Sequence, residues 1–324
     1  MFMQKPKVVV LGGGTGMPVL LKGLKHLPID LSVIVTVADD GGSSGKIRQD
    51  MDIPAPGDIR NVIAALANVD DEMNEMFQHR FQTNNELSGH ALGNLVLVAL
   101  NHMTGNFYEA VKKLANIFQV NANIIPVVNE AVVLNALMDD GSIIIGESNI
   151  PVHNKKIDRV FLTPNNVKPL PETVEAILEA DVIVISPGSL YTSILPNIII
   201  SDIVRALNET KAKTMYVCNV MTQLGETNDY DATSHVQAIY NHIGPHTIDA
   251  IVVHKEAISK PIRQIYEKEQ SFPVTYNIEE LEQLGLEVME EHILDPHKTV
   301  VRHNKEKIAE IIYDYAMNNM NGKG

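Results

Sequence analysis

Short apolar runs alternate with segments of helix-like spacing along most of the chain. An apolar run at residues 7–11 leads into glycines, then into helix-like apolar spacing at residues 17–27, and then into a second apolar run at residues 31–38. Apolar positions three or four residues apart indicate an amphipathic helix, and short bounded apolar runs indicate buried strands. A helix that connects two such strands implies parallel pairing with a right-handed crossover. The chain therefore opens as a doubly wound parallel sheet.

The pattern changes twice after this opening. Residues 58 to about 120 are predicted to be mainly helical, whereas residues about 124–164 hold short runs of branched residues between turn signals and are predicted to form a small β-rich insertion. Strand and helix alternate again over residues 171–254. The part at about 261–324 is predicted to be a C-terminal appendage with a short strand and a final amphipathic helix.

These elements predict a Rossmann-like three-layer α/β fold with a mainly parallel sheet. A chain of 324 residues is long enough to bury one large core. We therefore interpret residues 1–324 as a single α/β domain that carries the β-rich segment and the appendage. A boundary near Val120 or Pro171 is the alternative.

Composition narrows the functional classes. Cys218 is the only cysteine, so an intrachain disulfide is excluded and an oxidising compartment is not implied. No apolar run reaches bilayer-spanning length and the N-terminus does not read as a signal peptide, so we expect a cytoplasmic protein without membrane insertion. Forty acidic against twenty-six basic residues give a net charge of −14, which argues against nucleic acid as a partner. Small phosphorylated ligands and a homo-oligomer stay compatible with this composition, because backbone amides can bind an anion in an acidic protein.

A glycine-rich loop joins the first predicted strand to its helix. Missing β-carbons allow the backbone to approach an anion closely, and the helix N-terminus supplies amides that point at it. The pattern is neither a complete dinucleotide fingerprint nor a Walker A loop, and a turn that serves only packing is the alternative. The predicted phosphate-binding residues are Gly12, Gly13, Gly14, Thr15 and Gly16.

Two adjacent carboxylates follow the second predicted strand. Asp39 and Asp40 are expected beside the glycine-rich loop, because ligands bind at the carboxyl ends of parallel strands. Such carboxylates can accept ribose hydroxyls, hold Mg²⁺ or take a proton, so both are candidates for catalysis and for a magnesium site. We expect one to face the ligand and the other to cap the next turn. Further polar candidates nearby are Lys46, His90 and Asn94.

Polar residues also follow two later predicted strands. A hydroxyl-rich turn follows the apolar run at residues 181–186, and side-chain amides and hydroxyls follow the run at residues 214–219. These groups suit a second phosphate, a sugar or a base, while ordinary turn roles are the alternative. An arginine just before the last helix can reach a phosphate. The candidates for ligand binding here are Gly188, Ser189, Tyr191, Thr192, Ser193, Asn219, Thr222, Gln223 and Arg302.

Taken together, several motifs closely resemble the YvcK-type gluconeogenesis factors of the CofD-like superfamily. They run over nearly the whole chain and are GGGTG, VADDGGSSGKIR, PGDIRN, GHALGNL, SPGSLYTSILPN and CNVMTQLGET. The resemblance implies a Rossmann-like fold, a cytoplasmic bacterial protein that binds UDP-sugars such as UDP-N-acetylglucosamine, and a part in cell shape and envelope synthesis during gluconeogenic growth.

The enzyme branch of this superfamily suggests an alternative function. It transfers a phospholactyl-type group from a guanosine diphosphate derivative to a deazaflavin alcohol, with Mg²⁺ and an acidic residue near the acceptor hydroxyl. Asp39 or Asp40 matches that acidic position, whereas the continuation GGSSGK resembles the YvcK branch. The resemblance therefore favours a non-enzymatic UDP-sugar-binding regulator over a Mg²⁺-dependent 2-phospho-lactate transferase. An NAD-dependent oxidoreductase is a weaker third reading, because the dinucleotide fingerprint is incomplete.

Overall fold

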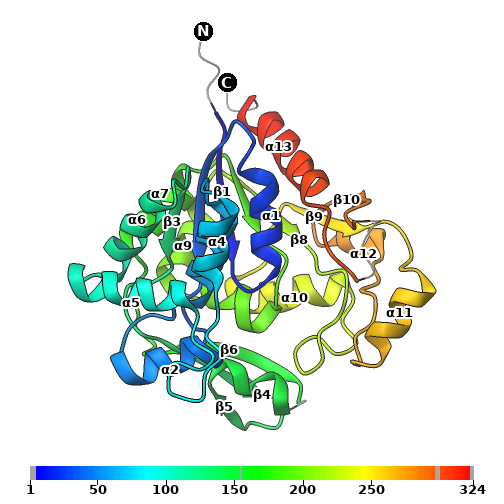
Figure 1. Cartoon of the computed structure of the whole chain (residues 1–324). Coiled ribbons are helices and arrows are strands. Elements are labelled where there is room, and N and C mark those ends of the chain that lie inside the picture. Colours follow the sequence, from blue (N-terminus) through cyan, green and yellow to red (C-terminus); the bar gives the residue numbers. More distant parts are fainter. Residues whose placement is uncertain (1–4, 154, 296–299, 322–324) are drawn as a thin grey trace.

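A parallel sheet forms the centre of the computed structural model, which describes residues 5–153, 155–295 and 300–321 (Figure 1). Its seven strands follow the order β10-β9-β8-β7-β1-β2-β3, and every neighbouring pair is parallel. The predicted Rossmann-like α/β class is confirmed. The strands are β1 (Lys7–Gly12), β2 (Asp30–Val35), β3 (Asn123–Pro126), β7 (Val182–Ile185), β8 (Lys213–Val217), β9 (Ala250–His254) and β10 (Glu287–Glu291).

The central strands are apolar along their whole length because helices cover both faces of the sheet. All four residues of β7 are buried, and so are five of the six residues of β1. Parallel sheets with covered faces carry continuous apolar runs in place of the alternation seen in half-exposed strands. This is the pattern that the sequence shows at each of these positions.

Two helical layers enclose the sheet. In one layer α1 packs against α3 and α13, and α3 contacts α6; in the other α7 packs against α9, α8 contacts α10, and α10 contacts α12. Figure 1 shows the final helix α13 beside α1, the first helix. The helices are α1 (Gly16–Leu24), α3 (Gly57–Leu66), α6 (Phe107–Ile117), α7 (Pro171–Glu179), α8 (Leu195–Ile198), α9 (Ser201–Glu209), α10 (Ala232–Ile243), α12 (Ile278–Gln283) and α13 (Lys305–Asn321).

The segment after β7 is strongly apolar. A π-helical turn at Leu190–Ile194 continues into α8, and a bend of 75° separates this stretch from α9. The bent pair has the length and composition of a membrane span, although all residues from 190 to 198 are buried inside the protein. Within the described residues, no single helix is long and apolar enough to cross a membrane.

A small antiparallel sheet lies outside the central layers. Its strands β4 (Val133–Met138), β5 (Ile143–Ile145) and β6 (Ile157–Thr163) follow the order β5-β4-β6, and two 3₁₀ turns, Glu147–Asn149 and Pro151–His153, connect β5 to β6. In Figure 1 this sheet lies at the end of the molecule opposite both termini. The predicted β-rich insertion is confirmed as this sheet, whereas β3, at the start of the predicted segment, pairs with β2 in the central sheet.

Four further helices complete the fold, and two of them, α4 and α5, lie in the stretch predicted to be mainly helical. The glycine and serine stretch after Asp40 forms helix α2 from Gly42 to Met51. Gly45 fits there because a side chain would collide with the carbonyl of Asp40. The other three are α4 (Asp71–Gln78), α5 (Leu92–Thr104) and α11 (Lys260–Glu267).

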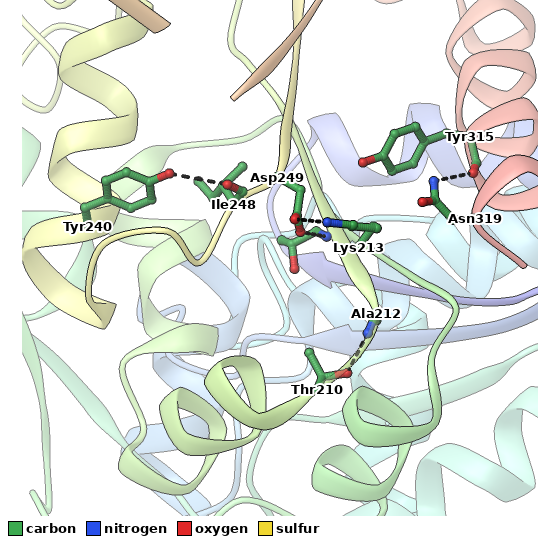
Figure 2. Close-up of polar contacts among 9 residues, drawn as sticks. Thr210, Ala212, Lys213, Tyr240, Ile248, Asp249, Tyr315 and Asn319 are labelled. Carbon is green, nitrogen blue, oxygen red and sulfur yellow. Dashed lines mark hydrogen bonds and ion pairs between the residues drawn. The ribbon is translucent and has the colours of Figure 1, made fainter. Parts of the chain in front are cut away.

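Polar contacts fasten the amino ends of the strands. Asp249, just before β9, pairs with Lys213 at 2.6 Å (Figure 2). It also accepts the backbone N–H of Thr214 at 2.9 Å. Asp181 accepts the backbone N–H of Lys7 in the same way, at 2.9 Å. These carboxylates hold neighbouring strands in register at the edge of the sheet remote from the carboxyl ends.

The chain reverses direction across the sheet between β1 and β7. From β1 it moves outward to β2 and β3, and it then returns to β7, β8, β9 and β10 on the other side of β1. In open α/β sheets, ligands bind outside the carboxyl ends of the strands at such a topological switch point. The fold therefore directs attention to the loops after β1 and β7.

Candidate functional site

A pocket of about 290 Å³ lies at this switch point, and we call it the switch-point pocket. The loops after β1, β7 and β8 line it together with the segment before α13. The described lining carries an arginine and no carboxylate. Eight residues predicted from the sequence lie here: Thr15, Gly16, Gly188, Ser189, Asn219, Thr222, Gln223 and Arg302.

Two of the lining residues that the sequence reasoning did not single out come from α11 and the segment after it. Tyr266 of α11 and Ser271 beyond it reach the pocket from the C-terminal part of the chain. The Tyr266 hydroxyl accepts the backbone N–H of Val301 at 3.0 Å, beside Arg302. Their sequence surroundings carry no glycine-rich or hydroxyl-rich signal, so only the fold shows that they converge on the pocket.

The glycine-rich loop has backbone conformations that need glycine. Gly12 has φ of 155° and Gly14 has φ of 66°. A side chain at Gly12 would collide with the hydroxyl of Ser186, and a Cβ at Gly14 would lie 2.9 Å from Ser193 Oγ. The loop therefore packs tightly against the turn after β7, and α1 starts at Gly16 with its N-terminal amides at the pocket.

Asp58 lies beneath the glycine-rich loop and is a site residue that the sequence reasoning missed. The backbone N–H of Gly14 donates to Asp58 Oδ2 at 2.9 Å. Burial raises the pKa of Asp58 to about 6, although the bond from Gly14 acts in the opposite direction. Asp58 lies in the first turn of α3, whose N-cap is Pro56. The only signal was a carboxylate in the stretch PGDIRN.

Side-chain amides hold the turn after β7 in place. Asn219 Oδ1 accepts the backbone N–H of Gly188 at 3.0 Å, and Asn219 Nδ2 donates to the Gly188 carbonyl at 2.7 Å. The Ser189 hydroxyl donates to Gln223 Oε1 at 2.7 Å. The strand end after β8 therefore shapes the wall of the pocket as well as lining it.

Three predicted residues lie behind that wall and outside the pocket lining. Tyr191, Thr192 and Ser193 are buried in the π-helical turn. The backbone amides of Tyr191 and Thr192 donate to the buried carboxylate of Glu226, and the Tyr191 hydroxyl contacts that of Tyr230 at 2.8 Å. These two amides are thus already engaged within the protein.

The adjacent carboxylates Asp39 and Asp40 are not part of the described lining of the switch-point pocket. Asp39 Oδ1 accepts the backbone N–H of Gly41 at 2.9 Å and so caps the turn before α2. Asp40 accepts the backbone N–H groups of Glu147 at 3.0 Å and of Ser148 at 2.8 Å. Asp40 therefore joins the central domain to the small sheet, and it lines a separate hollow of about 420 Å³ between them.

The remaining predicted residues surround α2. Lys46 Nζ donates to the Ser88 carbonyl at 3.3 Å. Ser43 Oγ contacts His90 Nδ1 at 3.2 Å and accepts from Asn94 Nδ2 at 3.0 Å. Asn94, at the start of α5, is buried. This group is brought together with Asp39 and Asp40, apart from the switch-point pocket.

Carboxylates gather on this second side. Burial raises the pKa of Glu147 to about 8, and the negative charges of Asp39, Asp40, Glu226 and Asp58 add to the rise. Among the described residues, no group of three or more His, Cys, Asp or Glu side chains is arranged to hold a metal ion. Mg²⁺ commonly binds through one or two carboxylates plus substrate phosphates, so the donor chemistry of Asp39 fits a magnesium ion that arrives with a nucleotide.

Comparisons with known proteins agree with this architecture. The model of the family described as "2-phospho-L-lactate transferase CofD" matches residues 8–294. The chain is 50% identical over 311 residues to the "Gluconeogenesis factor" of Bacillus subtilis (strain 168), covering 96% of this chain and 98% of that protein. It is 47% identical over 312 residues to the "Gluconeogenesis factor" of Halalkalibacterium halodurans, covering 96% of this chain and 97% of the relative.

A solved structure shares the fold over nearly the same span. The crystal structure of a Bacillus halodurans protein matches with a TM-score of 0.94 and 48% identity, covering 95% of this chain and 99% of that one. A second crystal structure, described as a member of the UPF0052 family, matches with a TM-score of 0.93 and 47% identity, covering 96% of this chain and 99% of the other. The match of the family model and the near full-length identity to these relatives lead to one conclusion: the chain belongs to the gluconeogenesis factor family, within the CofD-like superfamily.

Proposed function

We propose that this protein is a cytoplasmic regulator that binds a UDP-sugar, such as UDP-N-acetylglucosamine, in the switch-point pocket. Its role would be to support cell shape and envelope synthesis during growth on gluconeogenic carbon. The observation that carries the proposal is the charge of the pocket. In a chain with a net charge of −14, the described lining has Arg302, amide and hydroxyl side chains, and no carboxylate.

The lining divides into groups that suit different parts of such a ligand. The N-terminal amides of α1 and the exposed guanidinium of Arg302 suit the diphosphate. Thr222, Gln223 and Ser271 offer hydroxyl and amide groups that suit a base or sugar. The names of the relatives support the physiological part of the proposal.

Calorimetry with UDP-N-acetylglucosamine tests this function. We expect saturable binding that weakens at least about tenfold in Arg302→Ala, because a charge-assisted bond to phosphate is lost. Gly14→Ala should weaken binding as well, since its positive φ and the nearby Ser193 hydroxyl leave no room for a methyl group. Arg205→Ala is the matched control, because Arg205 is an exposed arginine on α9 outside the pocket lining. Absence of binding at millimolar ligand would contradict the proposal.

A Mg²⁺-dependent transferase is the second candidate function. The observations that favour it are the CofD family match and the carboxylate of Asp58 against the glycine-rich loop, with the charge of Asp39 near enough to raise the pKa of Asp58. Such an enzyme would move a phospholactyl-type group from a nucleotide diphosphate donor to a hydroxyl acceptor, which breaks the P–O–P bond of the donor and releases a nucleoside monophosphate. A bound Mg²⁺ would neutralise charge on the diphosphate, while Asp39 would hold the ion and a neighbouring carboxylate would accept the proton of the acceptor hydroxyl.

Turnover assays separate the two functions. The transferase reading expects product from a nucleotide diphosphate donor only with Mg²⁺, and strongly reduced product in Asp39→Asn. Unchanged turnover in both Asp39→Asn and Asp40→Asn would remove these residues from catalysis. Ligand binding that is saturable without any product, with or without Mg²⁺, would leave the regulatory function as the supported one.

A further inference from the structure

Glu226 is a buried carboxylate that accepts hydrogen bonds from four donors. Glu226 is only 4% exposed to solvent. Oε2 accepts the backbone N–H groups of Tyr191 at 3.0 Å and of Thr192 at 3.3 Å. Oε1 accepts the Thr192 hydroxyl at 2.9 Å and Gln223 Nε2 at 2.8 Å. Each donor lies on, or directly behind, the wall of the switch-point pocket.

These bonds replace a missing helix cap. Tyr191 and Thr192 are the second and third residues of the π-helical turn, whose N-terminal amides have no partner within the turn. The residue at the N-cap, Ser189, makes no capping bond with its side chain. Its hydroxyl donates to Gln223 instead, at the pocket wall. Glu226 thus caps this turn from a distant segment and leaves Ser189 available to the pocket.

The loop that carries Glu226 is itself held firmly. The Glu226 and Thr227 backbone N–H groups donate to the Gln223 carbonyl at 3.1 and 2.9 Å, and the Gln223 N–H donates to the Thr227 hydroxyl at 2.9 Å. Gly225 has φ of 83°, and its backbone packs on the carbonyl of Pro151. The carboxylate therefore has a fixed position from which to place the turn after β7.

We propose that Glu226 is a positioning residue for the switch-point pocket, and that its ionised form sets the geometry of Ser189 and Gln223 on which ligand affinity depends. The proposal rests on the proposed function of this pocket. The ionised carboxylate can accept all four bonds, whereas a protonated carboxyl group becomes a donor at one oxygen and releases part of the cap.

The electrostatic surroundings of Glu226 determine how ligand affinity should change with pH. Burial raises the pKa of Glu226 to about 7, while the bonds from Thr192 and Tyr191 act against that rise. The titratable groups that face it are Tyr191 on the π-helical turn and Glu147 on the first 3₁₀ turn of the small sheet. Protonation on going below pH 7 removes accepting capacity, so affinity should be higher above this pH and lower below it.

A pH series of calorimetric titrations with UDP-N-acetylglucosamine tests the proposal on the wild-type protein and on Glu226→Gln. We expect wild-type affinity to fall about tenfold between about pH 8 and about pH 6, because this range spans one unit on each side of the pKa. Glu226→Gln should bind about tenfold more weakly at the upper pH and lose this difference at the lower one. Glu209→Gln, an exposed glutamate at the end of α9, is the matched control.

Two outcomes would overturn the proposal. One is a wild-type affinity that does not change across this pH range, which needs no variant to fold. The other is a Glu226→Gln variant with the wild-type affinity and pH profile. A purely structural role predicts that thermal stability and affinity fall together, whereas we expect stability to be kept because a neutral amide is cheaper to bury than a carboxylate.

Hydrogen exchange provides a readout that does not need a ligand. Peptides over residues 187–195 should exchange faster in Glu226→Gln than in the wild type, because a neutral amide oxygen is a weaker acceptor for the Tyr191 and Thr192 amides than the carboxylate. If no UDP-sugar binds the wild-type protein, the proposed function fails while this measurement still decides the role of Glu226. Unchanged exchange over these residues would contradict the positioning role.

Discussion

Hydrogen bonds from side-chain amides fix much of the geometry of the switch-point pocket. Asn219 forms two hydrogen bonds with the backbone of Gly188, one as donor and one as acceptor. Only an amide side chain offers both functions in a planar group of this size. The pocket wall therefore depends on the chemical identity of this residue as well as on its shape.

Replacing Asn219 by aspartate changes both functions. Asp would keep the acceptor for the Gly188 N–H but turn the donor into a second acceptor that faces the Gly188 carbonyl. It would also introduce a negative charge into the pocket that we propose binds a diphosphate. We expect Asn219→Asp to weaken UDP-sugar binding by more than about tenfold, measured by calorimetry. Asn241→Asp, at a residue outside the switch-point pocket, serves as the control, and equal affinity of Asn219→Asp and the wild type would contradict the role assigned to Asn219.

Asp58 makes stability depend on pH in a direction unusual for a carboxylate. Its pKa is raised to about 6 from the usual value of 3.8, so the folded state binds the proton more tightly than the unfolded state. The contribution of protonated Asp58 to the free energy of unfolding is fully present below the pKa that Asp58 has in the unfolded chain. It is lost as the pH rises through the folded-state pKa of about 6. Asp58→Asn keeps an acceptor for Gly14 without the buried charge.

We therefore expect Asp58→Asn to be more stable than the wild type at neutral pH, by on the order of 2 kcal/mol, with the difference vanishing towards about pH 4. Denaturant unfolding of both proteins at several pH values measures this. A variant that is less stable than the wild type at every pH would show that the carboxylate stabilises the loop.

The residues of the pocket could be predicted from the sequence only where the signal was local. Glycines and hydroxyls after a buried strand identify Gly16, Gly188 and Ser189 without knowledge of the fold. Asp58 and Glu226 act through backbone amides of Gly14 and Tyr191, which are distant along the chain. No spacing rule connects such pairs, so the structure was needed to find them.

Among the elements, the small antiparallel sheet depends on few polar contacts with the central domain. Asp40 accepts the N–H groups of Glu147 and Ser148, and His242 of α10 accepts the N–H of Val160 at 3.0 Å through Nε2. Each contact comes from a different element of the central domain. The sheet is therefore held from two sides.

Asp40→Asn should weaken the attachment of the small antiparallel sheet on the Asp40 side. An asparagine offers a single acceptor oxygen in place of two, so one of the two N–H groups loses its partner. We expect faster hydrogen exchange over residues 143–153, with the rest of the central sheet unchanged. Asp139→Asn is the control, because Asp139 is an exposed carboxylate next to β4. Unchanged exchange over this segment would show that Asp40 does not hold the sheet.

Element prediction succeeded where apolar periodicity was strong and failed where packing decided the conformation. The buried strands β1, β7, β8 and β9 read directly as apolar runs. Helix α2 did not, because its sequence GSSGKIRQDM is mostly polar and glycine-rich. Its Ser43, Ser44 and Ile47 are buried against neighbouring segments, a tertiary effect that local propensity cannot show.

At the scale of the whole molecule, the pocket draws on both ends of the chain. Thr15 and Val19 come from the first crossover, while Val301 and Arg302 come from the segment before the last helix. A chain that ends at residue 300 would lack Arg302 and also α13, which packs on α1. We expect such a truncated protein to show no thermal shift with UDP-N-acetylglucosamine, whereas the full chain gains about 2.7 kcal/mol at a ligand concentration of 100 times Kd. A comparable shift in both would show that the C-terminal segment does not contribute.

The packing of α13 against α1 also has a consequence for folding during translation. A side chain at Gly23 of α1 would collide with the carbonyl of Lys305 in α13, so the first and last helices meet with no space between them. During synthesis the first helix must wait for almost the entire chain to leave the ribosome before it finds this partner. A nascent chain consequently has no complete switch-point pocket, and the proposed ligand could bind there only after translation of the chain has finished.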